Sequence, residues 1–223
     1  MGVQGMSGTE RLLRIPVVVA IVGGPLGYLL GGLLAPAIHD SGPATIAANA
    51  AANPAGNAMH LAAFVLASFL LPVGAAGLGY LGYRRNPRLA LGAGLLGVLG
   101  WLPFSALTAL DDLARAMTRH PGARENGALL DTFTNDAVMS TYLVVYVAFH
   151  LVAYVMLGVI LGRGRIIPRW AAWMMAASSP LTIAAFAFHS SARTAVGVAA
   201  LALLLAGSVP AARAMAAPAR ART

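Results

Sequence analysis

The stretch that decides the fold is VMSTYLVVYVAFHLVAYVMLGVILG, residues 138–162, which has the length and composition of a helix that crosses a bilayer. Within it a tyrosine or histidine recurs at every fourth position. Four residues turn about 400° and rise about 6 Å, so these side chains share one slowly drifting face. Hydrocarbon offers phenol and imidazole groups no partners, and the face therefore points to a protein interior or a wet cavity. This polar ladder consists of Tyr142, Tyr146, His150 and Tyr154.

The composition of the whole chain is that of a membrane protein. Of its 223 residues, 59% are hydrophobic and 10% are charged, and the mean hydropathy is +0.76, whereas a soluble domain carries about 25% charged residues. All of the positive charge is arginine, in short clusters between apolar segments where membrane topology explains it, so we expect no nucleic-acid partner. With no cysteine, disulfides, thiolate metal sites and thiol catalysis are excluded.

Hydropathy predicts one all-α domain over residues 1–223, an integral membrane six-helix bundle. The first segment is not a signal peptide, because its apolar run of about twenty residues exceeds the usual 7–15. Pro72, Pro103 and Pro180 are expected to kink three of the helices. The predicted spans are 12–38, 58–83, 89–110, 138–162, 170–189 and 194–212.

Arginine placement predicts that both termini are cytoplasmic. With that orientation only four arginines fall outside, namely Arg115, Arg119, Arg124 and Arg193, while the other eleven lie inside. The two long connections, 39–57 and 111–137, are then external, and most acidic residues lie in them. Abundant alanine and glycine with arginine but no lysine is typical of a GC-rich bacterial genome, so we expect a multi-pass protein of the bacterial cytoplasmic membrane, in contact with the lipid bilayer.

Polar residues at helical spacing on several spans fall between the outer interface and the middle of the membrane. His150 lies about 18 Å from the start of its span, near the midplane, where an imidazole is costly unless it is paired or functional. We therefore expect one outward-facing pocket. Its predicted catalytic residues are His150, Asp112 and His60, and its predicted substrate-binding residues are Tyr142, Tyr146, Tyr154, Trp101 and His189.

Several of the polar residues also have a purely structural interpretation. Hydroxyls in membrane helices usually bond back to their own backbone, which applies to Ser68, Ser105 and Ser178. Asn135 or Asp136 is placed to cap the fourth span. Asp111 and Asp112 end a helix at the interface and can be solvated, and His120 lies in a charged loop. Interfacial belt positions suit Tyr80, Tyr83, Trp101 and Trp170.

Glycines are crowded on the first three spans, and Gly23, Gly27 and Gly31 form a small-xxx-small row on the first. Such faces let helix backbones approach closely in lipid. Packing inside one bundle is the favoured explanation, and an oligomer formed through these glycine-rich faces is the alternative.

Three functions are compatible with this set of residues. The first is an enzyme that applies acid–base chemistry to a lipophilic, isoprenoid-like substrate, for example its cyclisation or isomerisation, without a cofactor. An imidazole and a carboxylate act as acid and base, and tyrosine faces stabilise a carbocation. The second is a metal or haem site, for which His39, His60 and His189 with Asp112 are candidates, although no HxxxH or HExxH pair is present. The third is a small-solute transporter or receptor.

The turn Arg165-Ile166-Ile167-Pro168-Arg169-Trp170 resembles the R-x-I-P-R-W turn of many small bacterial multi-pass membrane proteins of unassigned function. The external loop from Thr45 to Asn57 is similar to theirs as well. The resemblance implies a multi-pass membrane protein and assigns no site residue. Integral-membrane terpene cyclases share the size and the helix-rich plan as a distant architectural analogy, but the acidic residues expected within their bundle are not found inside these spans.

Overall fold

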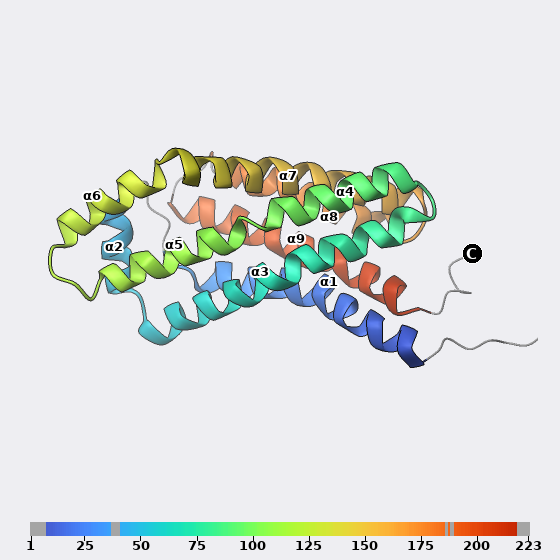
Figure 1. The fold of residues 1–223 in the computed structure, drawn as a ribbon, viewed down its shortest axis with the longest axis horizontal. Coiled ribbons are helices and arrows are strands. Elements are labelled where there is room, and N and C mark those ends of the chain that lie inside the picture. The colour runs from blue at the N-terminus through green and yellow to red at the C-terminus, as the bar shows by residue number, and fades with distance from the viewer. Residues whose placement is uncertain (1–7, 37–40, 186, 188–189, 218–223) are drawn as a thin grey trace, which may run out of the picture.

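The structure is a computed structural model that describes residues 8–36, 41–185, 187 and 190–217. Every regular element among these residues is a helix (Figure 1). The helices are α1 (Gly8–Leu34), α2 (Gly42–Ala51), α3 (Pro54–Tyr83), α4 (Pro87–Trp101), α5 (Phe104–Met117), α6 (Ala123–Thr134), α7 (Ala137–Arg163), α8 (Arg169–Ala185) and α9 (Ser190–Ala216).

Six of the helices lie side by side along the long axis of the molecule and close into a ring (Figure 1). The order of packed neighbours is α1, α3, α4, α7, α8, α9 and back to α1. In this ring α1 faces α7 across the bundle interior. The predicted all-α bundle is therefore present.

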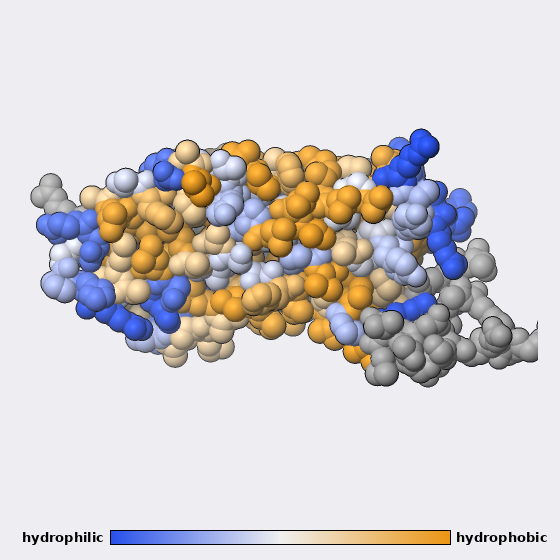
Figure 2. All heavy atoms as spheres, in the orientation of Figure 1, coloured by the Kyte–Doolittle hydropathy of each residue, from blue (hydrophilic) through white to orange (hydrophobic). Residues whose placement is uncertain are grey.

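Among the described residues, five stretches of helix are long and apolar enough to cross a membrane. Apolar side chains cover the middle of the face shown in Figure 2, and hydrophilic side chains gather at both ends. The chain is thus a multi-pass membrane protein. The predicted span 170–189 overlaps α8, which has 17 residues and ends at Ala185, and α8 is not among the five candidates. The five candidates are Arg14–Leu34, Pro54–Tyr83, Pro87–Met117, Ala137–Arg163 and Ala192–Ala216.

One end of the bundle, the arginine end, holds the tight turns between α3 and α4 and between α7 and α8, with Arg84, Arg85 and Arg165 exposed. The other end, the capped end, is covered by α2, α5 and α6 packed together. The sequence predicts only long connections there, at 39–57 and 111–137. They form helices because Ile46, Ala114 and Leu130 bury a small second core.

The helix predicted to end near residue 110 breaks earlier and then continues. Between α4 and α5 the chain turns at Leu102 and Pro103, since proline has no amide hydrogen to donate to the preceding turn. After this predicted kink, α5 runs on to Met117 as part of the capped end. Helices α3 and α8 continue through Pro72 and Pro180.

Small residues bring the backbones of neighbouring helices together. A Cβ atom added to Gly27 would lie 3.0 Å from the carbonyl oxygen of Ala63, and one added to Gly100 would lie 2.5 Å from the backbone nitrogen of His150. All three glycines of the row on α1 face residues of α3. The interpretation of this row as packing inside one bundle is confirmed.

The structural interpretation of three membrane hydroxyls is also confirmed. Ser68, Ser105 and Ser178 each donate to the backbone carbonyl oxygen three residues earlier, at 2.8, 2.9 and 2.8 Å. Asp136 caps α7, because its carboxylate accepts the amide hydrogen of Val138 at 2.8 Å. These groups are satisfied locally and contribute no functional site.

Candidate functional site

Aromatic and imidazole rings from five helices meet inside the bundle, toward the capped end. We call this set the ring cluster. Except for the half-buried Phe64, its members are almost fully enclosed. It consists of Tyr28 on α1, His60 and Phe64 on α3, Trp101 on α4, Phe104 on α5, and Tyr146, His150 and Tyr154 on α7.

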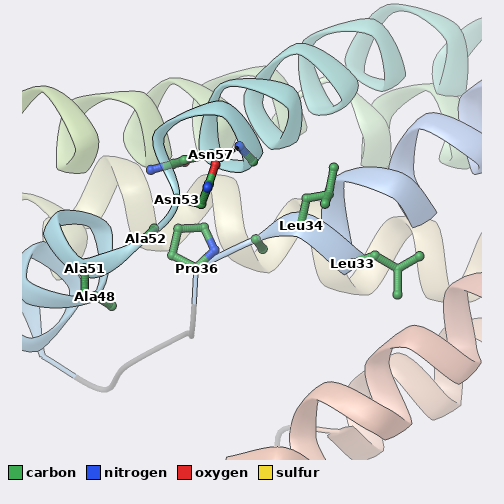
Figure 3. A pocket seen from close by; sticks show the side chains of 10 residues that line it. Leu33, Leu34, Pro36, Ala48, Ala51, Ala52, Asn53 and Asn57 are labelled. Carbon is green, nitrogen blue, oxygen red and sulfur yellow. Dashed lines mark hydrogen bonds between the residues drawn. The ribbon is translucent and has the colours of Figure 1, made fainter.

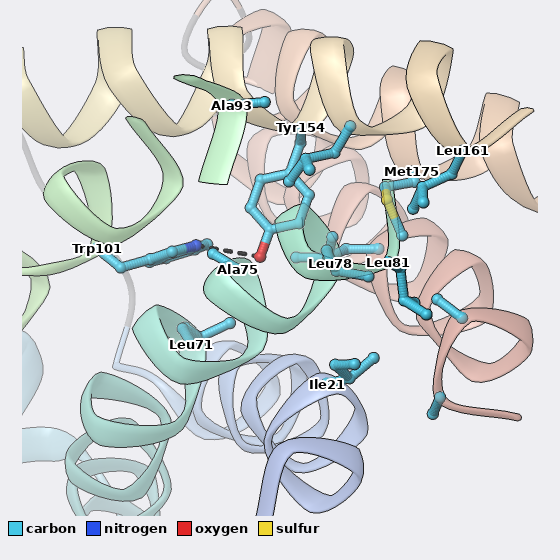
Figure 4. Close-up of a cluster of buried hydrophobic side chains, with 14 of the residues drawn as sticks. Ile21, Leu71, Ala75, Leu78, Leu81, Ala93, Trp101, Tyr154, Leu161 and Met175 are labelled. Carbon is cyan, nitrogen blue, oxygen red and sulfur yellow. Dashed lines mark hydrogen bonds between the residues drawn. The ribbon is translucent and has the colours of Figure 1, made fainter. Parts of the chain in front are cut away.

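Trp101 lies at the centre of the ring cluster. Its ring centroid is 5.2 Å from that of Tyr28 and 5.1 Å from that of His150. The indole Nε1–H donates to the hydroxyl of Tyr154 at 3.1 Å (Figure 4). The interfacial belt position predicted as an alternative for Trp101 is wrong, since the side chain is 1% exposed. A partner inside the protein replaces the interfacial water that the indole would otherwise need.

His150 presents a bare nitrogen to the ring cluster. Its Nδ1 lies in hydrogen-bond contact with the backbone carbonyl oxygen of Tyr146. A carbonyl only accepts, so Nδ1 carries the proton and Nε2 keeps its lone pair. No described residue donates a hydrogen bond to Nε2, although the side chain is 3% exposed. With no anion beside it, the buried imidazole is neutral, because an unpaired charge here would be costly.

A pair of tyrosine hydroxyls connects opposite sides of the bundle. Tyr28 on α1 and Tyr146 on α7 share a hydrogen bond between their phenol oxygens. Both rings also pack on Phe104, with centroids 5.1 and 5.9 Å away. Aromatic rings therefore fill the centre of the bundle at this level, where a pore would need open space.

His60 links the ring cluster to the exposed surface of the capped end. Its Nδ1 lies 2.8 Å from the carbonyl oxygen of Gly31, and its Nε2 lies 3.6 Å from a carboxylate oxygen of Asp111. The imidazole is enclosed, with 3% of its side chain exposed, whereas Asp111 is 49% exposed. A backbone carbonyl oxygen and a carboxylate therefore face the two ring nitrogens of His60.

The neighbouring carboxylate, Asp112, is a catalytic residue predicted from the sequence, but it does not face His60. It pairs with Arg115 at 3.0 Å, and 57% of its side chain is exposed. Consecutive residues are about 100° apart around a helix, so only one of the two aspartates can face His60. The structure places Asp111 in that position.

Helix geometry also separates Tyr142 from the rest of the polar ladder. Steps of four residues drift by about 40° each, so Tyr142 has turned about 120° from Tyr154. It is 42% exposed on the outside of the bundle, whereas Tyr154 is 2% exposed. His189 lies outside the described residues, as do His39 and Asp40.

The structure therefore brings together His60, Trp101, Tyr146, His150 and Tyr154, which the sequence predicts as site residues. It adds four residues that the sequence does not assign to the site, namely Tyr28, Phe64, Phe104 and Asp111. Tyr28 could have been noticed as the one polar ring within the apolar, glycine-rich part of α1.

The structure does not test the predicted metal or haem site, because two of its candidate ligands, His39 and His189, lie outside the described residues. The described residues contain no group of three or more histidine and acidic side chains that could hold a metal ion. His60 and His150 contact the ring cluster at different points, His60 through Phe64 and His150 through Tyr146 and Trp101. Neither histidine lines the pocket at the start of α3 or the pocket at the turn before α8.

Comparison with known proteins places the chain in a family. Residues 17–212 match the model of a family described as Domain of unknown function (DUF4386). No curated protein and no solved structure matches the chain. The analogy with terpene cyclases gains no support from these comparisons. The match agrees with the resemblance to multi-pass membrane proteins of unassigned function, and the chain belongs to the DUF4386 family.

Proposed function

We propose that the chain is a membrane enzyme that moves protons to and from a lipophilic, isoprenoid-like substrate, which enters from the bilayer by displacing rings of the ring cluster. One observation supports this most: Nε2 of His150 is buried without a hydrogen-bond partner among the described residues, in the tautomer that leaves it able to accept a proton. A purely structural histidine would ordinarily have both ring nitrogens satisfied.

The proton donor in this proposal is the His60–Asp111 pair. The pair delivers a proton to a substrate double bond, and the resulting carbocation lies among aromatic faces that stabilise positive charge. Nε2 of His150 then removes a proton from a neighbouring carbon, which leaves an isomerised or cyclised alkene and a protonated His150. His150 returns this proton to water when the product leaves and is neutral again for the next turnover. Because Asp111 is half exposed at the capped end, water can restore the proton on the pair.

The proposal includes an orientation for the bundle. Six spans with both termini cytoplasmic would place the arginine end inside a bacterial cytoplasmic membrane and the capped end outside. The chain has no cysteine, so single cysteines report on topology without background. A membrane-impermeant maleimide should label Thr132→Cys on α6 in intact cells and Arg88→Cys on α4 only after permeabilisation. The reverse pattern would contradict the orientation.

Solvent deuterium tests the chemistry even while the substrate is unidentified. The purified protein, reconstituted with the neutral lipid extract of its expression host, is incubated in deuterium oxide, and the extract is analysed by mass spectrometry. We expect deuterium on carbon in at least one polyunsaturated or isoprenoid component. His150→Gln, which keeps a polar side chain but removes the basic nitrogen, should abolish the exchange.

The matched control is the same substitution at an exposed histidine, His120→Gln, which should leave the exchange unchanged. Exchange that persists in a folded His150→Gln protein would refute the assignment of the base. A component of the extract that co-purifies with the protein but never exchanges would instead favour the receptor or transporter hypothesis.

A further inference from the structure

A second candidate site lies at the capped end, and none of its lining residues belongs to the ring cluster. A pocket of about 550 Å³ opens between the end of α1, the end of α2 and the start of α3 (Figure 3). This volume lies in the range of small-molecule sites, about 300–1,000 Å³. Its lining consists of Leu33, Leu34, Ala35, Pro36, Ala48, Ala51, Ala52, Asn53, Gly56 and Asn57.

A chain of amides leaves one buried acceptor in this pocket. Nδ2 of Asn49 donates to the carbonyl oxygen of Thr45 at 3.0 Å, which orients the amide of Asn49 because a carbonyl can only accept. Oδ1 of Asn49 therefore faces Asn57 and accepts from its Nδ2 at 2.9 Å. Oδ1 of Asn57 is left over. No described residue donates to it, and Asn57 is 4% exposed.

A buried acceptor without a donor destabilises the folded protein, so the pocket favours an occupant that supplies a donor. Asn53 lies one turn before Asn57 on the same wall (Figure 3). The oxygen of Asn53 already accepts the amide hydrogen of Gly56 at 3.0 Å, and its Nδ2 remains able to donate. A hydroxyl group both donates and accepts, and it matches this pair of amides.

The rest of the pocket selects for an uncharged, apolar molecule. No charged side chain is among its described lining residues, so a phosphate or carboxylate would lose its hydration without gaining a partner. Leu33 and Leu34 end a candidate membrane span and are 54% and 37% exposed, so the pocket is open toward lipid. A molecule can therefore enter sideways from the bilayer, with its tail along α1.

We propose that this pocket binds a lipophilic alcohol, with its hydroxyl donating to Oδ1 of Asn57 and accepting from Nδ2 of Asn53. Asn57 lies three residues before His60 on α3, about 4.5 Å along the helix axis. Alcohol binding at this pocket does not require proton transfer at His150, so it is tested independently of the proposed enzyme activity.

Tritiated 1-dodecanol tests the proposal with the full-length protein in phosphatidylcholine nanodiscs, and empty nanodiscs give the background. We expect saturable binding that unlabelled 1-dodecanol displaces. Its methyl ether, 1-methoxydodecane, cannot donate a hydrogen bond and should compete about tenfold less well or worse. Dodecanoate at neutral pH should compete equally poorly.

Variants locate the binding site. Ala51→Phe fills the pocket from α2 and should abolish saturable binding, while Ala47→Phe, an exposed position on the same helix outside the lining, should not. Asn57→Leu should weaken binding about tenfold or more. If the Asn57→Leu protein does not fold, the binding measured with Ala51→Phe tests the location of the site. Binding no greater than in empty nanodiscs, equal competition by the ether, or unchanged binding to Ala51→Phe would overturn the proposal.

Discussion

Replacing Tyr154 with phenylalanine removes one oxygen atom from the centre of the bundle. The hydroxyl of Tyr154 accepts the indole hydrogen of Trp101 at 3.1 Å, and the two side chains are 2% and 1% exposed. The phenylalanine ring keeps almost the same volume, so no sizeable cavity forms. The change therefore isolates the hydrogen bond from the packing around it.

The expected loss of stability is about 1 kcal/mol. A buried donor without a partner costs about 1–3 kcal/mol in water-soluble proteins. Hydrogen bonds between membrane helices average about 0.6 kcal/mol and reach about 1.7, because the unfolded state in the membrane also finds partners. Because the side chain of Trp101 is 1% exposed, water cannot replace the lost partner in the folded state. We therefore expect a loss of stability above the membrane average of about 0.6 kcal/mol.

Reversible unfolding of the protein in mixed micelles, with increasing denaturing detergent, measures this difference. Tyr142→Phe is the matched control, since it removes the same atom from the same helix at a side chain that is 42% exposed, and we expect a change within about 0.5 kcal/mol. Equal effects of the two substitutions would refute the reasoning. So would a loss above about 3 kcal/mol at Tyr154, which would require a packing defect rather than a hydrogen bond.

The remaining predictions concern helix packing at glycines, the contact between Asp111 and His60, and visible absorption. Gly100→Ala should cost about 1–3 kcal/mol in the same unfolding assay, because the new Cβ lies 2.5 Å from a backbone nitrogen of α7. Gly92→Ala, with nothing within 4 Å, should cost nothing or stabilise by up to about 1 kcal/mol. Asp111→Asn should cost about 1 kcal/mol through its contact with His60, and Asp112→Asn less than about 0.5; equal losses would contradict the assignment of the pair. A visible spectrum before and after dithionite should be featureless, and a Soret band would support the haem hypothesis.

Much of the fold was predictable because its causes are local. In a bilayer, a spanning segment must be a long apolar helix whose backbone groups are satisfied internally, and hydropathy therefore locates the long helices of the bundle. The hydroxyl of Ser68 and the cap at Asp136 depend on atoms within four residues of them along the chain. The capped end was missed because its helices are held by contacts between distant segments, such as the hydrogen bond from the backbone of Gly42 to Asp131.

The candidate site was only partly predictable, since small rotations decide which side chains meet. The four-residue spacing identified Tyr146, His150 and Tyr154. It could not show that the rotation of about 40° at each step turns Tyr142 out of the bundle interior. The choice between Asp111 and Asp112 depends on the rotation of α5 after the break at Pro103, which no local pattern encodes. Trp101 resembles a belt residue in the sequence, and only its distant partner at Tyr154 keeps it inside.

The proposed function depends on the state of one imidazole, and nitrogen NMR of that ring tests it most directly. The protein is labelled with ¹⁵N-histidine and reconstituted in bilayers at neutral pH, and the spectrum of His150→Gln identifies the signals of His150 by difference. We expect a neutral ring with a protonated Nδ1 and a bare Nε2, because Nδ1 donates to the carbonyl of Tyr146. A proton on Nε2, in either the other tautomer or a charged ring, would contradict the account and remove His150 as the base.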